Sequence, residues 1–167
     1  IIEKLLKLNY KIILRPHPMS IKLDHKKLSE IDEKFSSNDN FSLSKKDDNS
    51  QDYLKSEIII SDWSGAALEF CLGLNRSAIF IDTPQRVRNK EYLNNKSIQE
   101  KTFEYSVRGK LGQIIKTNEI HKITEYINLL KKNTGHYESN LSEINNNFLF
   151  NVGSSVEKAC DYLEEQI

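Results

Sequence analysis

The amino-acid sequence predicts an α/β fold built on a parallel sheet, and three observations support this expectation. Short apolar runs alternate with segments of helical periodicity along the 167 residues, which is typical of β–α–β units. Apolar residues make up 38% and charged residues 29% of the chain, a globular composition. Polar clusters, RPHP at residues 15–18 and SDWSG at 61–65, follow two of the apolar runs. Because ligands collect at the carboxyl ends of parallel strands, the two clusters predict one binding site.

Short strands are expected where the apolar runs occur. The strongest run contains Ile58, Ile59 and Ile60, which are apolar on both faces and therefore predict a central position in the sheet. The expected strands cover residues 11–14, 41–44, 57–61, 77–82 and 113–116.

Helices are expected where apolar residues return at spacings of three and four. Pro16 and Pro18 predict that neither strand nor helix continues through the first polar cluster. Residues 85–106 are polar and rich in Asn and Lys, and are either a functional loop or a solvated connection. The expected helices cover residues 2–9, 22–35, 50–55, 65–74, 117–132, 137–149 and 154–166.

Composition narrows the possible functions. Lys plus Arg equals Asp plus Glu at 24 each, which argues against a nucleic-acid partner because polyanion-binding proteins carry a basic excess. Cys71 and Cys160 lie in apolar helical patterns and predict small core residues rather than a disulfide. His25, His121 and His136 have no metal-ligand spacing, so no metal site is expected. No apolar run is long enough for a membrane span.

The second polar cluster predicts a strand–turn–helix unit that binds a phosphate. Ser61, Ser64 and the amides around Gly65 lie at a helix N-terminus, where unpaired N–H groups and the helix dipole attract anions. Glycine leaves room for an oxyanion to approach. The alternative is that Asp62 and Ser64 only cap the helix. Glu69 lies further along the helix, either as an acceptor for ribose hydroxyls or as a solvated residue.

The first polar cluster predicts a second set of phosphate contacts. The Arg15 guanidinium offers a fork that matches phosphate oxygens. His17 lies between two prolines, and a nearby dianion would favour its protonated form. The alternative is an ordinary surface turn. Trp63, in the other cluster, either stacks on a nucleotide base or packs beneath its own loop.

The motifs RPHP, SDWSGAALEF and AIFIDTP occur in that order, and this part of the chain resembles the C-terminal half of the CDP-glycerol glycerophosphotransferase family. The resemblance covers most of residues 10–85, and the interval between the first two motifs also matches. The chain departs from the family pattern at three positions. It has Gly65 where the family usually has Ser, Trp63 where Tyr is frequent, and Glu69 where the acid is often Asp.

The resemblance implies the C-terminal half of a GT-B fold, a Rossmann-like parallel sheet flanked by helices. Residues 1–167 would then be one donor-binding domain of a longer two-domain protein whose N-terminal half, with the acceptor site and the general base, is absent. Arg15 and His17 would be the catalytic contacts with the donor phosphates, and Glu69 would lie near the ribose. The phosphate-binding turn would consist of Ser61, Asp62, Ser64 and Gly65.

The activity that the resemblance implies is transfer of glycerol phosphate, or a related alditol phosphate, from a CDP-activated donor to a hydroxyl of a cell-envelope polymer. The expected partners are the nucleotide-activated donor, a polymer or lipid-linked acceptor and the N-terminal half, with no cofactor beyond the substrate. The expected location is the cytoplasm, at the inner face of the plasma membrane. Two other functions stay open: a GT-B glycosyltransferase that uses a nucleotide sugar, and a non-catalytic α/β docking domain.

Overall fold

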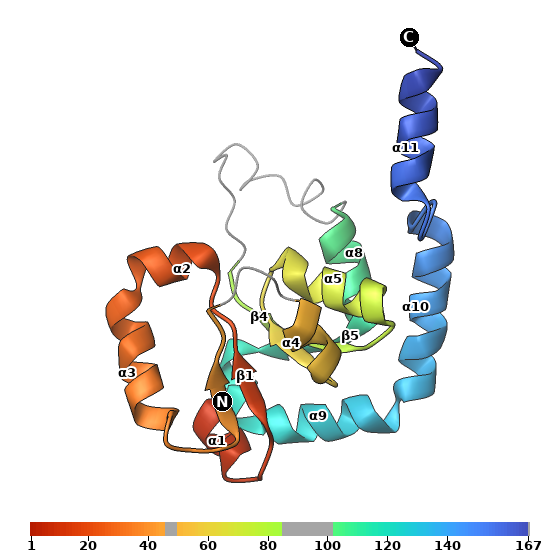
Figure 1. Cartoon of the computed structure of the whole chain (residues 1–167). Helices are drawn as coiled ribbons and strands as arrows, with labels where there is room; N and C mark the ends of the chain where they lie inside the picture. The colour runs from red at the N-terminus through yellow and green to blue at the C-terminus, as the bar shows by residue number, and fades with distance from the viewer. Residues whose placement is uncertain (46–49, 85–101, 167) are drawn as a thin grey trace.

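The computed structural model describes residues 1–45, 50–84 and 102–166, and places helices around short parallel strands (Figure 1). Most of the segment 85–106 therefore lies outside the described residues. All three strand pairings in the described ranges are parallel, which confirms the α/β class. The strands are β1 (Ile12–Leu14), β2 (Phe41–Leu43), β3 (Ile59–Ser61), β4 (Ala78–Asp82) and β5 (Gly112–Lys116).

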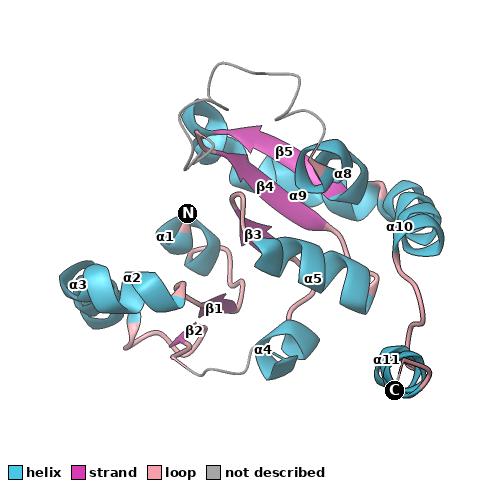
Figure 2. Ribbon diagram, turned by 90° about the horizontal axis from the view of Figure 1, so that it is seen from above, coloured by secondary structure: helices cyan, strands magenta, loops and turns pink. Residues whose placement is uncertain are grey.

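The described strands form two sheets rather than one. β1 pairs with β2, and β3, β4 and β5 form a second sheet in that order. Figure 2 shows the two sets as separate groups of arrows. β3 is therefore an edge strand, and its prediction as a central strand is wrong for this structure. The strand is apolar on both faces, but β4 covers it on one side only.

The helices follow the predicted order, with several corrections. The expected helix 2–9 ends at Leu6, and Asn9 adopts a left-handed φ of 59°. No helix or strand continues through residues 15–17, as predicted, but the next helix begins at Pro18 and not at residue 22, because a first-turn residue needs no N–H partner. The expected helix 117–132 starts as a 3-10 turn. The helices are α1 (Ile2–Leu6), α2 (Pro18–Leu23), α3 (His25–Phe35), α4 (Ser50–Lys55), α5 (Gly65–Leu74), α8 (Phe103–Leu111), η1 (Thr117–Lys122), α9 (Ile123–Lys132), α10 (Thr134–Phe148) and α11 (Ser155–Glu164).

The core lies on both faces of the larger sheet, because successive side chains of β4 point to opposite sides. Phe80 packs with the α5 and α8 residues Phe70 and Leu111, while Ile79 packs with Ile115 and with Ile127 of α9. Figure 2 shows α5 and α8 on one side of β4 and β5, with α9 on the other. This layering holds the carboxyl ends of β3 and β4 in a defined position.

Gly112 shows how closely β5 approaches β4. A Cβ added to Gly112 would lie 1.8 Å from the backbone oxygen of Ala78, so β5 can begin against β4 only with glycine there.

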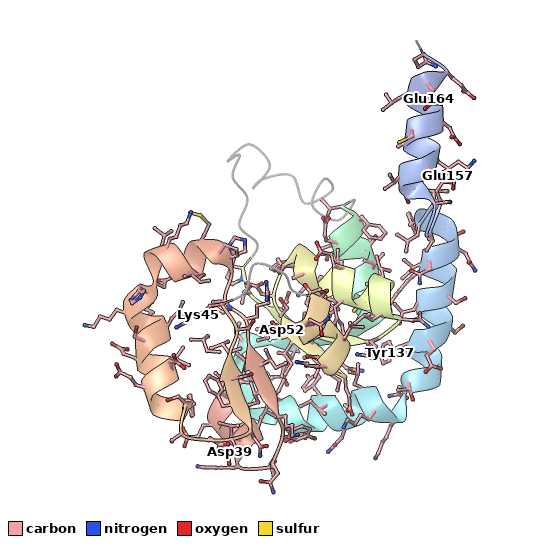
Figure 3. The ribbon with its side chains drawn as sticks, in the orientation of Figure 1. Asp39, Lys45, Asp52, Tyr137, Glu157 and Glu164 are labelled. Carbon is pink, nitrogen blue, oxygen red and sulfur yellow. The ribbon has the colours of Figure 1, made fainter. Side chains whose placement is uncertain are left out.

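Cys71 is buried, as predicted, but Cys160 is exposed, which corrects its prediction as a core residue. Cys160 belongs to α11, which projects from the body together with Glu157 and Glu164 (Figures 1 and 3).

Candidate functional site

The two polar clusters line one cavity. Its volume is about 1570 Å³, and its walls include all of β1 and all of β3. Arg15 and His17 enter it from the turn after β1, Ser61 from the last position of β3, and Asp62 and Ser64 from the turn that follows. The structure therefore brings together two segments that are far apart in the sequence. Two predicted site residues, Gly65 and Glu69, are not among the described residues that line the cavity.

Ser64 forms the N-cap of α5. Its Oγ accepts a hydrogen bond from the backbone N–H of Ala66 at 3.3 Å, and its carbonyl accepts one from Ala67 at 3.1 Å. The capping interpretation of this serine is thus confirmed, because its hydroxyl satisfies one of the open amides of the first turn. A Cβ on Gly65 would meet nothing within 4 Å. The position that a side chain would occupy at this residue is therefore open.

His17 has a structural duty at the start of α2. Its Nδ1 accepts a hydrogen bond from the backbone N–H of Met19 at 3.1 Å. The Nδ1 atom is occupied by this contact, which leaves Nε2 for a ligand. The expectation that a nearby dianion would favour the protonated form of His17 stays a prediction. The ring is exposed, and Nε2–H is the atom that can donate to a ligand.

Arg15 connects the ends of both strands of the smaller sheet to α4. Its Nη1 donates to Asp52 Oδ2 at 3.0 Å and to Ser44 Oγ at 3.3 Å, and Ser44 Oγ donates to the same carboxylate oxygen at 2.5 Å. Asp52 belongs to α4 and is labelled in Figure 3. A phosphate at this guanidinium would share it with Asp52. Sequence reasoning missed this partner because a single acid in a short helix carries no functional pattern.

A second basic residue, Arg108, was also missed. Its side chain is only 3% exposed, and its guanidinium carbon lies 3.6 Å from the centre of the Trp63 ring. It donates to the Ile81 carbonyl at 3.3 Å and pairs with Asp82 at 3.5 Å. Burial lowers the pKa of this guanidinium, and the Asp82 and Asp62 carboxylates oppose the shift. Arg108 escaped notice because its helix, α8, was expected to be partly polar connection.

Trp63 is held in place by the protein itself. Its Nε1 donates to the Thr83 carbonyl at 2.7 Å, and its ring stacks with Tyr105 at a centroid distance of 6.2 Å and an angle of 11°. With Arg108 on the ring as well, these contacts agree with the prediction that Trp63 packs within its own region. The indole joins the turn after β3 to the end of β4 and to α8.

In residues 1–45, 50–84 and 102–166, no three His, Cys, Asp or Glu side chains gather in a way that would hold a metal ion. In the same ranges, no helix combines the length and apolar character needed to cross a bilayer. Fold and cavity define a parallel α/β protein with polar turns at its strand ends. No protein-family model, curated protein or solved structure matches the chain.

Proposed function

We propose that this chain is the nucleotide-donor-binding domain of a transferase of the CDP-glycerol glycerophosphotransferase type, with the C-terminal half of a GT-B fold. The observation that carries the proposal is the shared cavity: the turns after β1 and β3 both line it. A diphosphate needs donors from more than one direction, and these turns provide them. The family resemblance supplies the particular donor, a CDP-activated alditol.

In this proposal, each group that would contact a phosphate has a different task. His17 would donate from Nε2–H to a phosphate oxygen while Nδ1 keeps the cap of α2. The N-terminal turn of α5 would place its amides and positive dipole end toward the other phosphate oxygens. Arg15 would contact a phosphate while it holds Asp52. These donors are fixed before the ligand arrives, which is the arrangement that stabilises developing charge in phosphoryl transfer.

The proposed reaction is a substitution at phosphorus. The acceptor hydroxyl oxygen forms a bond to the phosphorus that carries glycerol, the bond from that phosphorus to the bridging oxygen breaks, and CMP leaves with the electron pair. The hydroxyl proton passes to a base, which the family resemblance places in an N-terminal half. The acceptor, a polymer or a lipid-linked chain, would place this reaction at the inner face of the plasma membrane.

Binding can be measured through Trp63, the single tryptophan of the sequence. Titration with CDP and CMP should change its fluorescence with saturation at or below millimolar ligand, and calorimetry should give the same midpoint. CDP-glycerol should compete with CDP better than UDP- or GDP-sugars do, whereas the reverse order would favour the glycosyltransferase alternative. Absence of heat and of saturation at millimolar nucleotide would contradict donor binding and favour a docking domain.

A matched pair of variants separates the two tasks of His17. His17→Asn keeps a side-chain oxygen for the Met19 amide but lacks a donor at the position of Nε2, so nucleotide binding should weaken while α2 stays capped. His17→Ala should lose both. Equal nucleotide affinity for His17→Asn and the unaltered chain would show that the imidazole does not contact the ligand.

A further inference from the structure

We infer that the cavity between β1 and β3 is the place of an additional parallel β-strand, formed by residues of the same polypeptide on the N-terminal side of Ile1. The inference rests on the edges of the two sheets and is independent of the proposed nucleotide. In the described part of the chain, β1 has β2 on one side only and β3 has β4 on one side only. The cavity lies between the two remaining edges and touches every residue of both strands.

The backbone of β1 leaves hydrogen-bonding groups directed toward the cavity. The Ile12 N–H donates to the Asn40 carbonyl at 2.7 Å, and the Leu14 carbonyl accepts from Ser44 at 2.8 Å. Because alternate residues of a parallel strand bond to opposite sides, the N–H and carbonyl of Ile13 face away from β2. Ile13 is partly buried in the cavity wall, and backbone groups away from water require partners. A strand inserted beside β1 would supply them.

Side-chain composition supports the same conclusion. The segments that contain β1 and β3 are apolar on both faces, with Ile12 and Ile13 in the first and residues 58–60 in the second. This pattern is typical of a strand with neighbours on both sides. All of them are only partly buried, although exposed apolar edges promote aggregation. Sequence and structure agree once β1 and β3 each gain a second neighbour.

The cavity also has the right size. Strand spacing of about 4.8 Å, a layer about 10 Å thick and a rise of about 3.3 Å per residue give roughly 800 Å³ for a five-residue strand. The cavity of about 1570 Å³ holds this volume and leaves room at the strand ends. The room that remains includes the turns that carry His17 and Ser64.

Topology identifies the occupant. With one strand inserted, the order becomes β2, β1, inserted strand, β3, β4, β5, which corresponds to the order 3-2-1-4-5-6 of doubly wound dinucleotide-binding sheets when the inserted strand comes first in the chain. A strand that leads through α1 to β1 makes the usual right-handed crossover. Its carboxyl end would lie at the point where the strand order reverses, between the turns after β1 and β3.

The slot can be tested with a synthetic heptapeptide, Lys-Val-Ile-Val-Val-Ile-Lys, added to the 167-residue chain. We expect hydrogen exchange of the Ile13 amide to slow at least tenfold when the peptide is present. The same peptide with proline at its central position should give no protection, because proline removes a ladder donor. Protection at the outer edge of β2 in place of Ile13 would overturn the inference.

Two proline variants supply the matched control. Ile13→Pro removes the amide that faces the slot, whereas Leu43→Pro removes one that, by the same alternation, faces the outer edge of β2. Peptide affinity should fall at least tenfold for Ile13→Pro and stay within twofold for Leu43→Pro. Equal affinities would overturn the inference. Circular dichroism checks that each variant is folded. If Ile13→Pro does not fold, a heptapeptide with a single N-methylated central residue is tested on the unaltered chain in its place. This peptide should bind at least tenfold more weakly than the original heptapeptide.

The source of the strand needs its own measurement. In the polypeptide that carries the residues encoded before Ile1, the Ile13 amide should already be protected and the heptapeptide should not bind. Two results would contradict a strand from the same polypeptide. One is binding of the heptapeptide to the longer polypeptide, and the other is an Ile13 amide that becomes protected in the 167-residue chain only as the concentration of that chain rises. The second result would indicate a second copy. Loss of nucleotide binding alone would affect only the proposed function.

Discussion

Replacement of Arg108 by alanine should destabilise the fold through lost packing more than through lost charge. The guanidinium contact with Trp63 at 3.6 Å is a desolvated cation–π interaction of about 1–2 kcal/mol. Truncation also removes two methylenes, Cγ and Cδ, at about 0.8 kcal/mol each. Relief of guanidinium desolvation offsets part of the loss. We therefore expect a net cost of about 2 kcal/mol for Arg108→Ala.

Arg108→Met is the matched variant, because it keeps an unbranched apolar chain of similar length and removes the charge. The partner carboxylate, Asp82, has a side chain 46% exposed, so it stays hydrated when its cation is lost. We expect the free energy of unfolding of Arg108→Met to stay within about 1 kcal/mol of the original.

Urea unfolding measures both variants, with Trp63 fluorescence as the local signal and circular dichroism as the global one. With a slope of about 2 kcal/mol per molar urea, Arg108→Ala should lower the midpoint by about 1 M and Arg108→Met by less than half of that. Equal losses for the two variants would show that the guanidinium charge, through its ion pair and its contact with Trp63, and not packing, stabilises this cluster. An unchanged midpoint for Arg108→Ala would refute the reasoning altogether.

Further predictions concern small or buried residues. Gly112→Ala places a Cβ 1.8 Å from the Ala78 oxygen and should cost on the order of 3 kcal/mol or more, measured by urea unfolding; unaltered stability would contradict the close approach of β5 to β4. In the native protein, a thiol reagent should modify Cys160 quickly and Cys71 only after unfolding. Burial raises the pKa of the Cys71 thiol from 9.0 to about 12. As pH rises, the thiol ionises earlier in the unfolded chain than in the folded one. The contribution of the buried thiol to the free energy of unfolding is therefore complete below pH 9, and it falls by about 1.4 kcal/mol per pH unit between pH 9 and about 12. Cys71→Ala should show a shallower decline over that range, and parallel curves would contradict the assignment.

Local sequence signals predicted the elements whose conformation depends on near neighbours. The helix Gly65–Leu74 has the predicted bounds, because an N-capping serine and a continuous apolar stripe are both encoded within it. β4 differs from its predicted range only at Ser77. Where one residue type serves two conformations, the same reasoning failed. The helix expected from residue 22 begins at Pro18.

The candidate site shows the same division. The sequence predicted that the turns around His17 and Ser64 lie at strand ends, and the structure places both on one cavity. It did not predict that Arg15 already holds Asp52 or that Arg108 lies buried against Trp63. These partners come from other segments of the chain, so no local pattern encodes the pairing.

The sequence by itself determined the α/β class, the order of the strands along the chain and the positions of the polar turns. Periodicity, proline and capping residues act over a few neighbouring residues, and so they can be interpreted from one segment at a time. Only the tertiary structure decided that β3 is an edge strand facing a cavity and which carboxylates Arg15 and Arg108 contact. Those outcomes depend on which distant segments pack together, because burial and charge pairing are properties of the assembled layers.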